Sequence, residues 1–112
     1  MSNPKNLDDC VALARKKEQF KFNNVYSLYR QANALRIEPP TYTLYSYGQH
    51  YPMYVYDYEA CQWYGNKDKS TPTTNRHMKL FEPYSVAQWV DAEVLSSIAL
   101  HGIVQTSAQR ME

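Results

Sequence analysis

The sequence predicts an α+β fold, in which a three-stranded antiparallel meander carries an N-terminal helical hairpin and a C-terminal helix on one face. Two observations lead to this fold class. Apolar residues recur at helical spacing near both ends of the chain, and the segment 41–64 is dense in aromatic and β-branched residues. With 112 residues, 44% of them hydrophobic and 21% charged, the chain fits one globular domain over 1–112. We expect 1–6 and 104–112 to be flexible.

The N-terminal third predicts the helical hairpin. From Leu7, apolar residues recur at positions i, i+3, i+4 and i+7, which predicts a helix over about 7–20. The same spacing from Val25 predicts a second helix over about 25–36. This second helix should end before Pro39-Pro40, because each proline removes a backbone donor and holds the preceding residue in extended geometry.

The middle of the chain predicts the meander. Gly48 and the Glu59-Ala60 pair read as turns between segments of high β propensity. The three expected strands are 41–47, 51–58 and 61–64. Eight of the eleven tyrosines fall in this region, so any special property of the meander should come from tyrosine.

The last third predicts two more helices. A short helix is expected over 73–81, with a strand as the alternative. Ser85-Val86-Ala87-Gln88 has the S-x-x-Q spacing of a capping box and starts the clearest expected helix. Gly102 is suited to end it, since glycine readily adopts the left-handed conformation beyond a helix C-terminus.

Alternation along a strand places Tyr54, Tyr56 and Tyr58 on one face and Met53 and Val55 on the other. We expect Met53 and Val55 to face inward and the tyrosines outward. A row of phenol rings with hydroxyl groups is typical of protein contact surfaces. The predicted partner-binding residues combine this row with the basic segment that follows: Tyr54, Tyr56, Tyr58, Lys67, Lys69, Arg76 and His77.

Two other interpretations of the tyrosines stay open. They can simply cover a half-exposed sheet through cross-strand aromatic pairs. They can also stack the bases of a single-stranded nucleic acid, with Lys67, Lys69, Arg76 and Lys79 following the phosphates. The net charge of +1 weighs against a strongly nucleic-acid-binding surface. The basic strip Arg15-Lys16-Lys17 is interpreted as a solvated helix face.

The sequence contains no catalytic motif. Its three histidines are scattered, and no H-x-x-x-H, C-x-x-C or G-x-S-x-G pattern occurs. We therefore predict a protein that is not an enzyme, with no catalytic residue, no cofactor and no metal site. The alternative is a small enzyme that uses His50 and His77 as an acid–base pair.

The same sequence predicts a cytoplasmic protein. Its N-terminus lacks the apolar core of a signal peptide, and no apolar run reaches the roughly 18 residues of a membrane span. Cys10 and Cys61 should both be free thiols in a reducing compartment. We expect no membrane partner, and the sequence leaves a homo-oligomer open.

Two short elements carry a family resemblance. They are Ser46-Tyr47-Gly48-Gln49-His50-Tyr51-Pro52 and Ser70-Thr71-Pro72-Thr73-Thr74-Asn75-Arg76-His77. This region resembles a family of small bacteriophage-encoded proteins of unknown function, which implies a phage origin and no particular activity. Small phage proteins of this kind often inhibit host machinery. We therefore expect a phage accessory protein that binds and inhibits a host protein or ribonucleoprotein complex, including CRISPR-type defence systems.

Overall fold

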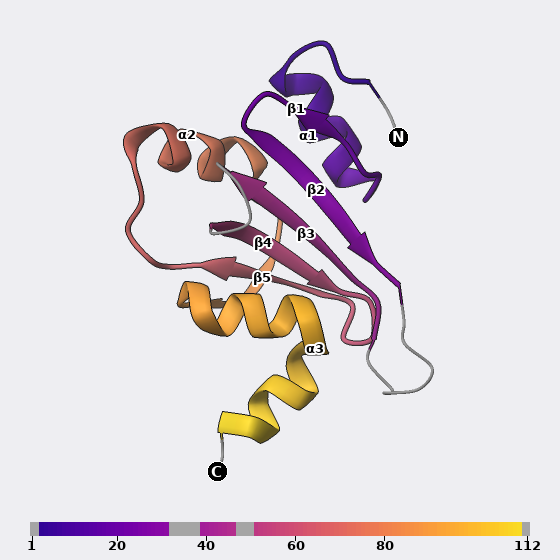
Figure 1. Cartoon of the computed structure of the whole chain (residues 1–112), viewed down its shortest axis with the longest axis vertical. Helices are drawn as coiled ribbons and strands as arrows, with labels where there is room; N and C mark the ends of the chain where they lie inside the picture. The colour runs from indigo at the N-terminus through magenta and orange to yellow at the C-terminus, as the bar shows by residue number, and fades with distance from the viewer. Residues whose placement is uncertain (1–2, 32–38, 47–50, 111–112) are drawn as a thin grey trace.

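The computed structural model describes residues 3–31, 39–46 and 51–110. Over these residues one six-stranded sheet is combined with three helices (Figure 1). In chain order the elements are α1 (Leu7–Arg15), β1 (Lys21–Phe22), β2 (Val25–Arg30), β3 (Thr41–Ser46), β4 (Pro52–Asp57), β5 (Gln62–Asn66), α2 (Pro72–Phe81), β6 (Val86–Val90) and α3 (Ala92–Arg110).

The sheet is larger than the predicted meander. Its strands lie in chain order from β1 to β6; β5 and β6 are parallel, and every other neighbouring pair is antiparallel. The predicted meander is present as β3, β4 and β5, but the prediction of a three-stranded sheet is wrong. Strands on both sides extend it, because two segments predicted as helices pair with its edges.

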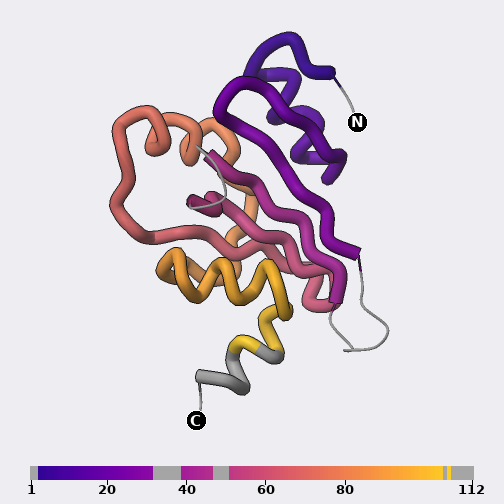
Figure 2. The backbone as a smooth tube through the Cα atoms, viewed as in Figure 1, coloured from indigo at the N-terminus to yellow at the C-terminus, as the bar shows by residue number. Residues whose placement is uncertain are grey.

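The helices cover both faces of the sheet, so the expectation that they pack on one face is also wrong. One apolar cluster joins Cys10 and Ala14 of α1 and Phe81 of α2 to the sheet. A separate cluster joins Leu95 and Ile98 of α3 to the opposite face. Figure 2 shows α1 and α3 at opposite ends of the longest axis of the molecule. Among the described residues, no helix is both long and apolar enough to cross a membrane.

Helix α1 forms where its sequence predicts a helix, but it is shorter than expected. The Asn6 side chain caps it by accepting a hydrogen bond from the Asp9 backbone N–H at 2.8 Å. The helix ends at Arg15, and Lys17 adopts a left-handed conformation with φ of 57°. This conformation turns the chain back toward β1, so the last residues of the predicted helix 7–20 are not helical.

The predicted second helix over 25–36 is wrong where the structure describes it. Residues 25–30 form β2, which pairs along its whole length with β3. Val25 and Ser27 are buried, as the two-residue period of a strand requires. A six-residue segment can fit both helical and strand periods, and the backbone pairing with β3 decided between them. Residues 32–36 of that prediction lie outside the described residues.

The predicted helix from Ser85 begins later than expected. Residues 86–90 form strand β6 beside β5, so the S-x-x-Q pattern is not a capping box here. The N-terminal cap of α3 is Asp91, whose Oδ1 accepts the Val94 N–H at 2.8 Å. An aspartate followed by Glu93 in the first turn was the signal for this helix start.

Gly102 divides α3 into two helical segments. It has φ of 82°, the conformation expected at a helix end, yet the chain resumes a helix and continues to Arg110. The backbone is helical up to Arg110, and the expected flexibility of 104–112 stays a prediction. The short helix predicted over 73–81 is confirmed as α2, with Thr71 as its N-cap.

Candidate functional site

Five aromatic side chains form a continuous strip across the sheet, on the face that carries α1. Their ring centroids lie between 5.0 and 6.2 Å apart, and every neighbouring pair meets edge to face. This is the favoured geometry of aromatic pairs in proteins. We call it the aromatic strip: Tyr29, Tyr58, Tyr56, Trp63 and Tyr42.

Two cations at the end of α1 lie over aromatic rings. The Lys17 Nζ atom is 4.3 Å from the centre of the Tyr56 ring and 6.0 Å from that of Trp63. The Arg15 guanidinium lies 4.6 Å from the centre of the Tyr84 ring. Such contacts are favourable because the negative faces of the rings attract the cations. Lys17 is thereby held against the aromatic strip, and Arg15 against Tyr84, which is not part of the strip.

A cavity of about 200 Å³ opens beside these cations. Val11, Leu44, Trp63 and Phe81 contribute apolar surface to it, and Leu44 and Phe81 are almost completely buried. The more exposed lining residues are charged or aromatic: Arg15, Lys17, Glu82 and Tyr84. We call this cavity the α1–α2 pocket. It combines an apolar floor with a predominantly positive rim.

Tyr84 is the most exposed large side chain at the site. Its relative exposure is 93%. Arg15 lies against its ring, so the tyrosine is held at the pocket rim while most of its surface remains open. Aromatic residues with this exposure are common among residues that contact partners.

The structure separates the three tyrosines predicted to form a binding row. Tyr56 and Tyr58 are partly exposed members of the aromatic strip. Tyr54 is completely buried, so its predicted outward position is wrong. Val55 faces α3 on the opposite side, as predicted, but Met53 lies in the same apolar cluster as Tyr54, where the register of the β3–β4 pairing shifts. Tyr54 is on the face away from α3, but α1 and α2 pack against that face, so the side chain is not exposed.

Burial of Tyr54 is completed by α2. Its hydroxyl donates a hydrogen bond to the Met78 carbonyl at 2.8 Å, and Trp89 meets its ring edge to face. Burial raises the pKa of Tyr54 above its ordinary value. A side chain in this position stabilises the fold, and it cannot contact a partner.

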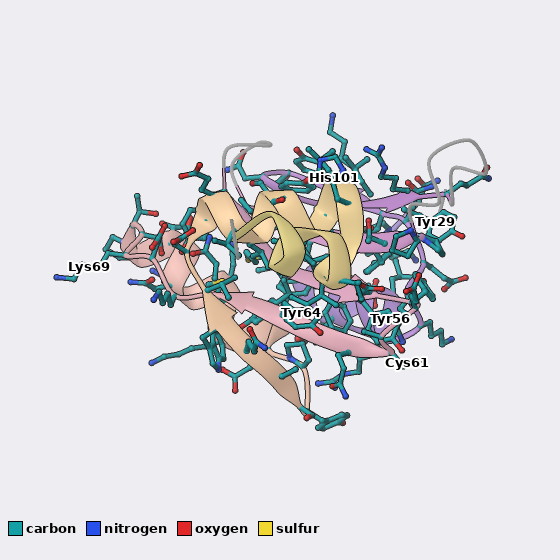
Figure 3. The ribbon with its side chains drawn as sticks, turned by 90° about the horizontal axis from the view of Figure 1, so that it is seen from below. Tyr29, Tyr56, Cys61, Tyr64, Lys69 and His101 are labelled. Atoms are coloured by element: carbon teal, nitrogen blue, oxygen red, sulfur yellow. The ribbon has the colours of Figure 1, made fainter. Side chains whose placement is uncertain are left out.

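The predicted basic residues do not join the aromatic strip. Lys67 and Lys69 are exposed in the segment beyond the C-terminal end of β5, whereas Tyr56 pairs with Trp63 near its start. Figure 3 places Lys69 and Tyr56 at opposite sides of the molecule. Arg76 is exposed on α2. The predicted set is therefore not one surface.

His77 lies in a buried polar cluster between β3 and α2. Its Nδ1 atom is 2.9 Å from the Ser46 hydroxyl, which is also 3.2 Å from the Thr74 hydroxyl. Burial and the positive charge of Arg76 lower the pKa of His77. The Ser46 side chain has no exposed surface, whereas His77 lines a separate cavity of about 150 Å³ together with residues of α1 and β2. His50, the other member of the alternative acid–base pair, lies outside the described residues.

Neither cysteine forms a disulfide, as the sequence predicted. Burial raises the pKa of the Cys10 thiol to about 11, with a contribution from Asp9, so this thiol is held in its unreactive protonated form. Within the part of the chain that the structure describes, no group of three or more His, Cys, Asp or Glu residues could hold a metal ion.

Sequence reasoning missed the residues that define the α1–α2 pocket. Arg15 and Lys17 were interpreted as a solvated helix face, and Trp63 and Tyr84 were not selected at all. A signal was present, because two cations at the end of an amphipathic helix can reach rings on the surface that the helix covers. Which rings they reach depends on how α1 crosses the sheet.

Comparison of the chain with protein-family models, curated proteins and solved structures finds no significant match.

Proposed function

We propose that this protein is a protein-binding module whose α1–α2 pocket takes an apolar side chain from a partner segment that also carries a carboxylate. The observation that carries the proposal is the combination of an open apolar cavity with two cations held over aromatic rings at its edge. The partly exposed tyrosines of the aromatic strip extend the same surface. They would contact the rest of the segment.

The size of the pocket supports a single side chain as its occupant. An apolar cavity of about 150 Å³ can hold a benzene ring, and the cavity here is about 200 Å³. A leucine or phenylalanine side chain there would contact Leu44 and Phe81 and would cover the exposed part of Trp63. Burial of a side chain of this kind is worth roughly 1.5–3 kcal/mol, before the cost of association.

Charge complementarity supports an acidic neighbour for that side chain. Arg15 and Lys17 give the rim two positive charges against the single negative charge of Glu82. A carboxylate on the partner would find Arg15 already ordered against Tyr84. Arginine binds carboxylates with paired hydrogen bonds, so it would fix the register of the partner segment.

A protein partner fits this surface better than single-stranded nucleic acid. A nucleic-acid groove needs positive charges that follow the backbone for several nucleotides. Lys69 lies on the opposite side of the molecule from Tyr56 (Figure 3), and Tyr54 is not available for stacking. The net charge of +1 gives little general attraction for phosphates.

The nature of the partner rests on the family resemblance alone. That resemblance would make the partner a host protein or ribonucleoprotein complex, and this protein a phage accessory inhibitor of a defence system. The α1–α2 pocket agrees with such a role because occluding a host surface requires binding and no chemistry.

A defined peptide library tests the proposal. Random heptapeptides displayed on beads are sorted against the purified full chain, and the enriched sequences are measured individually by fluorescence anisotropy. We expect enrichment of sequences that combine a large apolar residue with Asp or Glu. The Arg15→Glu/Lys17→Glu variant should bind those peptides at least about tenfold more weakly, since it reverses both charges at the rim.

The matched control is Lys67→Glu/Lys69→Glu, which makes the same change in net charge away from the pocket. It should bind the enriched peptides like the unchanged protein. Equal losses in both variants would mean that only overall charge matters, and would contradict the proposal. The second arm uses fluorescent single-stranded oligonucleotides of mixed sequence. Tight, salt-sensitive binding of these with no peptide enrichment would favour the nucleic-acid interpretation.

A further inference from the structure

Strand β6 forms one edge of the sheet. It pairs with β5 on one side, and within the described residues no strand pairs with its other side. In Figure 3 it is the outermost strand at the lower edge of the molecule. Its three central residues, Ala87, Gln88 and Trp89, are all exposed, and Trp89 exposes 44% of its surface.

This edge lacks the features that usually protect edge strands from pairing. Natural edges are kept short or carry charges, lysine above all, and proline. The opposite edge follows this rule, because β1 has only two residues and one is Lys21. By contrast, β6 has five residues, Val-Ala-Gln-Trp-Val, with no charge and no proline.

The backbone of β6 is oriented to accept another strand. The Val90 carbonyl points toward β5, where it accepts the Lys67 N–H at 2.8 Å. Successive residues of a strand direct their backbone groups to opposite sides. The N–H and C=O of Trp89 therefore point to the open side, where a neighbouring strand could bind them.

We propose that β6 pairs antiparallel with β6 of a second copy of this chain, about a two-fold axis through Gln88. In this register Ala87 lies opposite the second copy's Trp89, so a small side chain faces a large one. Asp91 lies opposite Ser85, and the like charges of the two Asp91 residues are kept apart. The contact is self-complementary, as a two-fold interface must be.

The dimer joins the two sheets into one continuous sheet across both copies. It uses the edge of the sheet, whereas the proposed partner site uses the face under α1, so the two proposals can fail independently. One short strand pair buries less than the roughly 1,200 Å² of a standard stable interface. We therefore expect a reversible dimer whose population rises with concentration.

Analytical ultracentrifugation of the full chain tests the dimer, over roughly 5–500 μM because the interface is small. Gln88→Lys places two like charges opposite each other on the two-fold axis, and it should weaken the dimer about fivefold or more. Gln88→Glu should do the same. An equimolar mixture of the two variants should restore the dimer, because lysine then faces glutamate.

Gln62→Lys is the matched control, since Gln62 is exposed on β5 and does not lie on the open edge. It should dimerise like the unchanged chain. The proposal is overturned if the unchanged chain is monomeric over the whole range, if Gln88→Lys dimerises normally, or if the mixture stays monomeric. Circular dichroism checks that each variant is folded.

A disulfide test fixes the register. Gln88→Cys is made together with Cys61→Asn, because Cys61 has φ of 55° and asparagine tolerates this conformation. Under mild oxidation the protein should form a covalent dimer through the two cysteines at the axis. The same experiment with Gln62→Cys should give no rapid cross-link. A cross-link at Gln62 and none at Gln88 would exclude the proposed pairing.

Discussion

The Asp57 carboxylate joins the end of β4 to the kink of α3 by accepting the Ile103 backbone N–H at 2.8 Å. The residues are 46 positions apart in the chain. Oδ2 makes this bond, while Oδ1 accepts the N–H groups of Glu59 and Ala60 in the turn after β4. Asp57 is 1% exposed, so its charge is stabilised by these three backbone donors. It fixes both the turn and the second segment of α3.

Replacing Asp57 should destabilise the fold strongly. Asp57→Asn removes the negative charge. It also replaces one carboxylate oxygen by an NH2 group, which cannot accept a hydrogen bond from a backbone N–H. We expect a loss of about 2–3 kcal/mol in the free energy of unfolding, because hydrogen bonds to a buried charged group are lost. Urea denaturation followed by circular dichroism measures it. Asp68→Asn, at an exposed carboxylate that accepts the Ala92 N–H, should cost only about 0.5 kcal/mol.

A side chain at Gly102 should be poorly tolerated. Its φ of 82° disfavours every other residue, and a Cβ atom would overlap Cγ of Pro39 and lie 3.1 Å from Asp57 Oδ2. We expect Gly102→Ala to lower the free energy of unfolding by about 1–3 kcal/mol. Ser96→Ala, at an exposed position of the same helix, should be neutral or slightly stabilising. Equal stability of the two variants would contradict a strained glycine at the kink.

Tyrosine hydroxyl groups should contribute to stability only where they are buried. Tyr54→Phe removes the hydrogen bond to the Met78 carbonyl and should cost about 1 kcal/mol in the free energy of unfolding. Tyr84→Phe, at a ring that is 93% exposed, should have no measurable effect on stability. Thermal unfolding of both proteins at one scan rate measures the difference. A larger loss of stability in Tyr84→Phe than in Tyr54→Phe would contradict this prediction.

Stability should fall on acidification because of His77. Its pKa is lowered in the folded protein, so the unfolded chain binds a proton first as the pH falls. The stabilisation is complete above the unfolded histidine value of about 6.5, and it is lost as the pH falls through the lowered folded value. Denaturation midpoints measured between about pH 7.5 and about pH 5, relative to those of His77→Gln, isolate this contribution. If the denaturation midpoint of His77→Gln depends on pH as steeply as that of the unchanged protein, the prediction is contradicted.

The sequence by itself determined the elements with strong local signals. The cap at Asn6 and the apolar spacing after it were sufficient for α1, and the density of aromatic and β-branched residues was sufficient for β3, β4 and β5. The short helix α2 and the interruption of α3 at Gly102 also follow from local chemistry. In these segments the local signals and the tertiary contacts favour the same structure.

The tertiary structure alone decided the rest. The β2 and β6 segments match a helical pattern over five or six residues, and they became strands because edges of the meander offered backbone partners. The tyrosines alternate as predicted, yet the crossing of α2 buried Tyr54 while Tyr56 and Tyr58 stayed partly open. The α1–α2 pocket brings Arg15 and Lys17 to Tyr84 and Trp63, and it exists only where two helices and the sheet meet. Pairing and layering depend on contacts between distant segments, which local spacing does not encode.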